Sequence, residues 1–235
     1  MLKVAHISNI GIYTEGWHKA RCGRATSSLI FNLMTDKFGS KDCVAYVYAK
    51  AGELVTGKAA DDDVIDNENT EWGREYEDQA IKKFSELKQI RLLAVQKLIM
   101  DPKTRFSSTP AAIWVHGQSL AVQDEYNVST LEVKCPRKYQ HFIPLWECET
   151  PADLKKFSKK YFWQVVDQMD NCNADVGYFA CYHPFFPPEL NMRIIEFRKI
   201  DLWDEFKLLK ERKRLFLSFL FEIAMKFRPT SFQEA

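Results

Sequence analysis

A short segment in which apolar and charged residues alternate, Leu131-Glu132-Val133-Lys134, constrains the fold of this chain more than any other feature. Strand side chains alternate between two faces, so a strand here puts the carboxylate and the amine on the same face. Cys135-Pro136 ends the strand, because proline cannot donate to a sheet ladder. Some twenty residues earlier, Ser108-Thr109-Pro110 reads as a turn. The separation predicts a hairpin that brings the two segments together.

A carboxylate beside a lysine at a strand end suits metal-dependent hydrolysis of phosphodiesters. Carboxylate oxygens bind hard divalent cations, and the lysine can orient the attacking water or stabilise charge on the phosphate. Such a site normally needs a second carboxylate from a neighbouring strand, but the expected position holds Ala111. Glu-x-Lys by itself is also common on solvated strands, so this interpretation depends on the rest of the chain.

Hydrophobic periodicity predicts an α/β (α+β) fold in which helices flank a mixed central sheet. The predicted helices cover 24–37, 42–55, 70–87, 151–171 and 201–227, and the predicted strands cover 91–100, 111–116, 129–134, 175–183 and 191–199, with Leu120–Gln123 as a weaker strand. The chain has no repeat and no Pro/Gly-rich linker. We therefore expect one domain over 1–235, with a core at about 10–200 and a C-terminal amphipathic helix at about 201–227.

The composition excludes several classes of protein and favours a cytoplasmic one. No apolar run approaches the roughly 20 residues that span a bilayer, and the N-terminus lacks a signal-peptide pattern. The six cysteines contain no Cys-x-x-Cys pair, which argues against a zinc site, a disulfide framework or an iron–sulfur nuclease. We expect reduced cysteines, no membrane partner and a location in the cytoplasm.

Charge is segregated along the chain although the net charge is only +1. DNA binding rewards positive charge, so a nearly neutral DNA-binding protein must concentrate its cations in a groove. Asp61–Asp66 is acidic, whereas lysines gather at 155–160 and basic residues at 210–214. Solvated helix faces would give the same pattern.

Three further groups of polar residues could line a cleft. Glu77 flanks the apolar stripe of its predicted helix, and Tyr161, Gln164 and Gln168 share one helix face. Near the N-terminus, Arg21 and Arg24 precede the hydroxyl residues 26–28, a combination that could bind an anion at a helix N-terminus. Ordinary surface positions, or a helix N-cap at Thr26 or Ser27, explain the same residues equally well.

Taken in order, these motifs resemble those of the phage lambda exonuclease and YqaJ-type viral recombinase family. The family pattern is a Trp-His-x-x-Arg-x-Gly-x-x-Thr/Ser-x-Ser opening, a Trp-Gly-x-x-x-Glu helix, a Ser-Pro-Asp-Gly turn, a Leu-Glu-x-Lys-Cys-Pro strand and a Tyr-x-x-Gln helix. The matching positions here are Trp17, His18, Arg21, Gly23, Thr26, Ser28, Trp72, Gly73, Glu77, Thr109, Pro110, Leu131–Pro136, Tyr161 and Gln164. The resemblance covers about residues 10–200, and five motifs in order make it specific.

The resemblance implies a restriction-endonuclease-like PD-(D/E)xK core and a magnesium-dependent 5′→3′ exonuclease. The implied substrate is the end of linear double-stranded DNA, and the product is a 3′ single-stranded overhang for recombination. Mn²⁺ is an alternative to Mg²⁺, and the implied partners are two further copies of the chain, in a ring-shaped homotrimer, and a single-strand annealing protein.

Roles transfer residue by residue onto the matching positions. Glu132 and the main-chain carbonyl of Val133 would hold the metal, Lys134 would position the water, and Glu77 and Gln164 would line the metal site. Residues that would hold the 5′-phosphate are Arg21, Ser28 and Thr109. We expect further DNA contacts from Tyr161, Lys156 and Lys160.

Ala111 departs from the family pattern, in which this position is aspartate and the next is glycine rather than Ala112. One metal-binding carboxylate is therefore missing, and the chain as written is expected to be inactive or strongly impaired. Ala111 could result from an engineered inactivation or from natural loss of the carboxylate, and both origins give the same sequence. The alternative function is a DNA-end binding protein that recruits an annealing partner and performs no chemistry.

Overall fold

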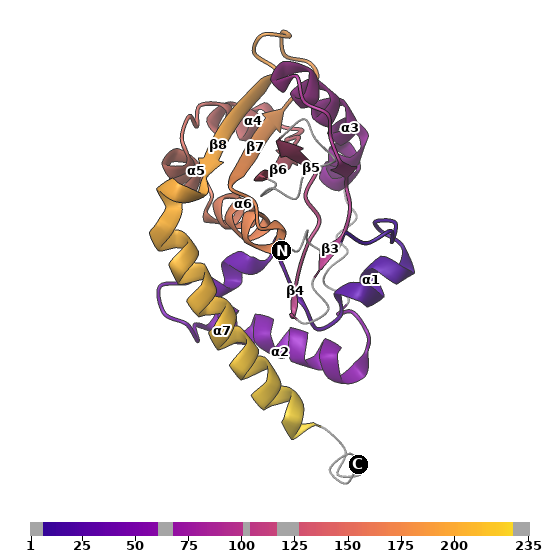
Figure 1. Ribbon diagram of the computed structural model, residues 1–235, viewed down its shortest axis with the longest axis vertical. Coiled ribbons are helices and arrows are strands. Elements are labelled where there is room, and N and C mark those ends of the chain that lie inside the picture. The colour runs from indigo at the N-terminus through magenta and orange to yellow at the C-terminus, as the bar shows by residue number, and fades with distance from the viewer. Residues whose placement is uncertain (1–6, 61–67, 101–103, 117–126, 228–235) are drawn as a thin grey trace.

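The computed structural model describes residues 7–60, 68–100, 104–116 and 127–227. A five-stranded sheet occupies the upper half of the molecule, and helices cover both of its faces (Figure 1). Its order is β2-β5-β6-β7-β8, with β2 at Ala94–Val95, β5 at Ala112–His116, β6 at Asn127–Lys134, β7 at Val176–Tyr182 and β8 at Met192–Arg198. The β6–β7 pair is parallel, and the β2–β5, β5–β6 and β7–β8 pairs are antiparallel. The predicted mixed central sheet flanked by helices is confirmed.

The central strand β6 is buried on both faces. Leu131 and Val133 pack in an apolar cluster with Ala80, Ile81 and Phe84 of helix α3, which spans Glu68–Lys88. Glu132 faces the other way, toward helix α6 (Lys159–Cys172). The strand therefore follows the predicted alternation, but its polar face lies against a helix and not against solvent.

A smaller sheet, in the order β1-β4-β3, lies below the large one (Figure 1). Its strands are β1 (Ala25–Thr26), β4 (Phe106–Ser108) and β3 (Ile99–Met100). The helix predicted at 24–37 is wrong, because backbone amides here bond to the β4 segment: Ala25 donates to the Arg105 carbonyl at 2.8 Å and Ser27 to that of Ser107 at 3.1 Å. The apolar spacing belongs to a 3₁₀ turn, η1 (Ile30–Leu33), since i, i+3 neighbours also align in that helix.

Two other predicted elements are interrupted. The strand predicted at 91–100 divides into β2 and β3, because Gln96 adopts a left-handed φ of 47° between them. The helix predicted at 151–171 divides into α5 (Pro151–Phe157) and α6, because Ser158 is extended and its Oγ accepts from the Tyr161 amide at 3.3 Å. The weak strand at Leu120–Gln123 lies outside the described residues.

The remaining helices are α1 (Glu15–Arg21), α2 (Lys41–Thr56), α4 (Tyr139–Trp146) and α7 (Trp203–Lys226), the last preceded by the 3₁₀ turn η3 (Lys199–Leu202). Helix α7 crosses the lower left of Figure 1 and packs beside α2. Helices α1 and α4 were not predicted. Within the described ranges no helix is long and apolar enough to cross a membrane, and all six cysteines are free.

Candidate nuclease site

A cleft of about 760 Å³ opens between α1, the ends of β1 and β4, the end of β6, and helices α3 and α6. Most predicted site residues line it: Arg21, Ser28, Glu77, Thr109, Glu132, Val133, Lys134, Lys160, Tyr161 and Gln164. Ala111 and Lys156 are not among the lining residues. Positions more than 130 residues apart in the sequence therefore meet at one opening.

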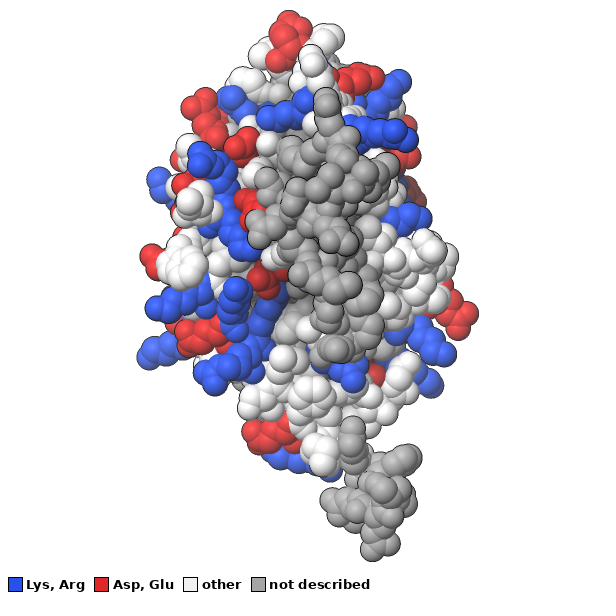
Figure 2. All heavy atoms as spheres, in the orientation of Figure 1, with Lys and Arg blue, Asp and Glu red and all other residues white. Residues whose placement is uncertain are grey.

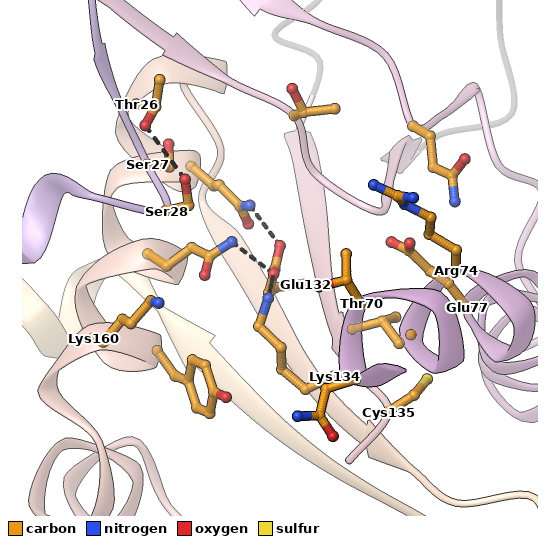
Figure 3. Close-up of a pocket in the computed structure, with 18 of the residues that line it drawn as sticks. Thr26, Ser27, Ser28, Thr70, Arg74, Glu77, Glu132, Lys134, Cys135 and Lys160 are labelled. Atoms are coloured by element: carbon orange, nitrogen blue, oxygen red, sulfur yellow. Dashed lines mark hydrogen bonds and ion pairs between the residues drawn. The ribbon is translucent and has the colours of Figure 1, made fainter. Parts of the chain in front are cut away.

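Glu132 is the best-anchored group of the cleft and is only 5% exposed. Its Oε1 accepts from Gln164 Nε2 at 2.6 Å and from Lys134 Nζ at 2.5 Å, and its Oε2 accepts from Gln168 Nε2 at 2.6 Å (Figure 3). The two glutamines lie one helical turn apart on α6, so one helix face supplies both amides. The sequence placed Gln168 on this helix face but gave it no role of its own. The i, i+4 spacing from Gln164 is the feature of the sequence that pointed to it.

Lys134 remains a cation in this setting. Burial by itself lowers the pKa of its amine, but Glu132, together with Tyr161 and Glu77, outweighs burial and raises that pKa above its ordinary value. Its Nζ also lies 5.4 Å from the centre of the Tyr161 ring. The amine is thus held in front of Glu132, where it could stabilise negative charge on a phosphate.

Glu77 reaches the cleft from the opposite side, on α3 (Figure 3). Burial, with a further contribution from the Glu132 charge, raises the pKa of Glu77 to about 7. The side chain is therefore partly protonated at neutral pH. Burial raises the pKa of the nearby Cys135 thiol as well, to about 12, so that this thiol stays neutral.

Ala111 immediately precedes β5, beside the part of β6 that carries Glu132. Its N–H donates to the Leu131 carbonyl at 2.8 Å and its own carbonyl accepts from the Gln96 amide at 3.0 Å. The residue is 2% exposed and belongs to the apolar cluster of β5, β6 and α3. The position is close to the site, but its methyl group contributes no ligand.

The residues present do not fit a tightly bound Mg²⁺ or Mn²⁺ ion. Glu132 and the Val133 carbonyl are available, but three donors already occupy the Glu132 oxygens, and Glu77 is partly protonated. Across the described part of the chain, His, Cys, Asp and Glu side chains form no group of three or more that could hold a metal ion. The metal ligand that is missing is a carboxylate at position 111, where Ala111 has only a methyl group.

The phosphate side of the cleft is built around Arg21, in the last turn of α1. Its guanidinium lies 3.8 Å from the centre of the Trp17 ring, which fixes its plane. Ser28 and Thr109 line the same opening, and Ser28 Oγ lies 3.3 Å from Thr26 Oγ1. The idea of two arginines in this pocket is wrong, because Arg24 is buried and its guanidinium donates to the Thr104 carbonyl. The helix N-cap alternative for Thr26 and Ser27 is also wrong, since both lie in or beside β1.

The lysine cluster is divided between two helices. The break at Ser158 places Lys156 on α5 and Lys160 on α6, so they do not share one helix face as predicted. Lys160 lines the cleft, whereas Lys155 forms an ion pair with Glu205 of α7 at 2.9 Å.

This fold and this cleft define a class of protein in which a Glu-x-Lys strand end meets a basic pocket inside a mixed α/β domain. The chain belongs to the family of the YqaJ-like viral recombinase domain, whose model matches residues 16–175. No curated protein matches the sequence. The family resemblance inferred from the sequence is therefore confirmed.

Solved structures support the same fold. An alkaline exonuclease from Laribacter hongkongensis aligns with a TM-score of 0.69 and 20% identity, covering 94% of this chain and 100% of that chain. Its complex with dAMP aligns with a TM-score of 0.68 at the same 20% identity, covering 94% and 100% of the two chains. A phage-related exonuclease from Haemophilus somnus 129PT aligns with a TM-score of 0.62 and 14% identity, covering 87% of this chain and 96% of that one. The predicted fold class of a restriction-endonuclease-like core is confirmed by these neighbours.

Proposed function

We propose that this chain is a 5′→3′ DNA exonuclease of its family that acts on linear double-stranded DNA ends and leaves 3′ single-stranded overhangs. The observation that supports the proposal best is a single cleft that holds both an anchored Glu132–Lys134 pair and the Arg21–Ser28–Thr109 pocket. The pocket offers a guanidinium and hydroxyls to a terminal 5′-phosphate. Lys134 would then stand near the next phosphodiester of the same strand.

With alanine at position 111 the chain is expected to bind DNA ends and to cleave them poorly. Phosphodiester hydrolysis in this family pattern depends on a divalent cation, and losing a ligand carboxylate costs orders of magnitude in rate. The second candidate function, a DNA-end binding protein without chemistry, is favoured by the same Ala111. Binding is common to both candidates, and only the chemistry separates them.

The deciding experiment restores the carboxylate with Ala111→Asp. A linear duplex labelled at either its 5′ or its 3′ end is incubated with the variant and Mg²⁺ or Mn²⁺. We expect early release of the 5′ label by Ala111→Asp, with activity lost in EDTA and near zero in the unaltered chain. Ala111→Asn is the matched control, because asparagine has the shape of aspartate but no negative charge.

Each outcome decides between the candidates. An Ala111→Asp protein that binds duplex ends but never degrades them favours the non-catalytic end-binding function. Early release of the 3′ label would reverse the proposed polarity. Robust cleavage by the unaltered chain would remove position 111 from the metal site.

The proposal extends to assembly through the family resemblance. A homotrimer would let duplex DNA enter one side of a ring, and a single-strand annealing protein would receive the overhang as it forms. The annealing protein matches the chemistry of the proposed product, which is single-stranded DNA.

A further inference from the structure

A buried polar network lies directly behind the phosphate side of the cleft. Its members are Ser27, Ser108, Asp167, Asn171 and Lys213, contributed by the ends of β1 and β4 and by helices α6 and α7. Asp167 is fully buried, and Ser27 and Ser108 are each 2% exposed. Burying a carboxylate and an ammonium inside a core is costly unless every partner is in place.

The hydrogen bonds of this network converge on Asp167, because Asn171 Nδ2 donates to Asp167 Oδ2 directly at 3.0 Å as well as through the two serines. Asn171 Nδ2 donates to Ser108 Oγ at 2.6 Å, and Ser27 Oγ donates to Asp167 Oδ2 at 2.6 Å. The two serine oxygens are 2.5 Å apart. Because the Ser27 proton is committed to Asp167, the Ser108 hydroxyl must donate to Ser27. Each hydroxyl thus has one donor role and one acceptor role, which fixes both side chains.

Lys213 holds the far end of the network. Its ammonium contacts Asp167 Oδ1 at 2.6 Å, Asp170 Oδ2 at 2.7 Å and Asn171 Oδ1 at 2.8 Å. The contacts with Asp170 and Asn171 are hydrogen bonds, and the contact with Asp167 is an ion pair. The contact with Asn171 Oδ1 also turns the Asn171 amide nitrogen toward Ser108 and Asp167, so the Lys213 cation orients the amide that donates to Ser108.

The two serines at the near end each precede a residue of the phosphate pocket. Ser27 is followed by Ser28, and Ser108 by Thr109, and both of these successors line the cleft. Thr26, Ser27 and Ser28 run along one edge of the cleft in Figure 3. The ends of β1 and β4 are joined by the backbone pair Thr26–Ser107. The hydrogen bond between the Ser27 and Ser108 side chains adds a second link between them.

We propose that Lys213 and Asp167 are positioning residues for recognition of the DNA end: they lock Ser27 and Ser108, and thereby hold Ser28 and Thr109 at the spacing that a terminal phosphate requires. This inference rests on the proposed function, because it takes the Arg21–Ser28–Thr109 pocket as the phosphate site. Neither Lys213 nor Asp167 lines the cleft. Their side chains connect to the phosphate pocket through Ser27, which itself lines the cleft, and through Ser108.

The test compares duplexes with a 5′-phosphate and a 5′-hydroxyl end in EDTA, where ends are not consumed, using fluorescence anisotropy. Lys213→Met removes the cation at the far end of the network, and Ser108→Ala removes the hydroxyl next to Ser27 at a residue that does not itself line the cleft. We expect each change to lower the preference for 5′-phosphate by about tenfold, the size of one lost charge-assisted hydrogen bond. The double variant should lose no more than Lys213→Met alone, because both changes cut the same path.

Arg212→Met is the matched control. Arg212 is a buried cation on the same helix, but it donates to the Thr35 and Asp36 carbonyls and has no link to the serines. It should weaken folding, measured by thermal melting, and leave the phosphate preference unchanged.

Three results would overturn the inference. Lys213→Met and Ser108→Ala proteins that keep the full preference, while Arg21→Ala loses it, would refute the positioning role alone. Equal loss in Arg212→Met would reduce the effect to general destabilisation. If the unaltered chain shows no preference, the phosphate pocket itself fails and the inference fails with it. Should Lys213→Met not fold, Ser108→Ala decides between the first two results.

Discussion

Two carboxylates share the cleft in different electrostatic states. Glu132 accepts hydrogen bonds from two amides and an ammonium, whereas burial and the Glu132 charge raise the pKa of Glu77 to about 7. Neighbouring carboxyl groups often divide acid and base roles in this way, because one charge opposes the ionisation of the next. The sequence identified both residues, but it could not assign their protonation.

The raised pKa of Glu77 makes the stability of the fold depend on pH. Below about pH 4.5 Glu77 is protonated in both the folded and the unfolded state, and above about pH 7 the folded state carries an unfavourable charge. Glu77→Gln should therefore raise the free energy of unfolding above pH 7 by about 3 kcal/mol, since the pKa rises from 4.5 to about 7 and one pKa unit corresponds to roughly 1.4 kcal/mol. The gain should fade as the pH falls from 7 to 4.5.

Urea unfolding at pH 5 and pH 8 measures this difference, with Glu86→Gln, an exposed position on the same helix, as the control. An equal change at both pH values would mean that the substitution alters packing and not ionisation.

At the scale of elements, the phosphate pocket is assembled from the ends of α1, β1 and β4. Gly23 has a φ of +66°, and a Cβ there would lie 2.9 Å from Leu54 Cβ, so only glycine lets the chain turn sharply from α1 into β1. The buried Glu53 carboxylate accepts from the Gly23 amide at 2.9 Å and fixes this turn on α2. The turn places Arg21 and Ser28 on the same opening.

Arg21→Ala should therefore abolish the preference for 5′-phosphorylated ends. A guanidinium that binds a terminal phosphate acts locally, so salt-dependent affinity for internal duplex should change little. Competition between phosphorylated and hydroxyl ends measures the effect.

Lys19→Ala removes a cation from the same helix and does not line the cleft, so it should keep the preference. If Arg21→Ala also keeps it, the terminal phosphate binds elsewhere in the cleft.

At the scale of the whole molecule, a net charge of +1 is compatible with DNA binding because charge is local. Exposed charges act only within about 10 Å at 0.1 M salt. Lys and Arg side chains gather along the left side of the face in Figure 2, with acidic residues between them. At the mouth of the cleft, burial and the nearby Lys134 lower the pKa of Lys160, so two cations act on the same space.

The double change Lys156→Ala and Lys160→Ala should weaken duplex binding without altering end preference. The slope of log affinity against log salt should fall by up to about 2, because each lost phosphate contact removes roughly 0.9. A fall near 0.9 would assign the contact to Lys160 alone, which is the lysine that lines the cleft.

Titrations at four salt concentrations measure the slope. Lys82→Ala with Lys226→Ala, two exposed lysines outside the cleft, is the matched control. An unchanged slope in the Lys156/Lys160 variant would place the DNA path nearer Arg137 and Lys138.

The sequence by itself determined the central strand and most of the site. Alternation fixed which face of β6 carries Glu132 and Lys134, and periodicity fixed α2, α3 and α7, because these patterns depend only on local backbone geometry. The ordered motifs identified the family, and the alanine at position 111 was visible as a missing carboxylate. The elements follow from residues close in the sequence, and the family follows from the order of short motifs, so none of these conclusions requires knowledge of contacts in space.

Only the tertiary structure decided where the chain breaks and what lies behind the pocket. A helix was expected over 24–37, but Ala25–Thr26 form β1, because β4, some eighty residues later, supplies their hydrogen-bond partners. Ser158 interrupts a long helical pattern, and this break removes Lys156 from the cleft. The network from Lys213 to Ser27 joins residues almost two hundred positions apart. Buried polar groups form hydrogen bonds with whichever partners lie close in space. That proximity is set by the packing of the whole core and cannot be read from local sequence patterns.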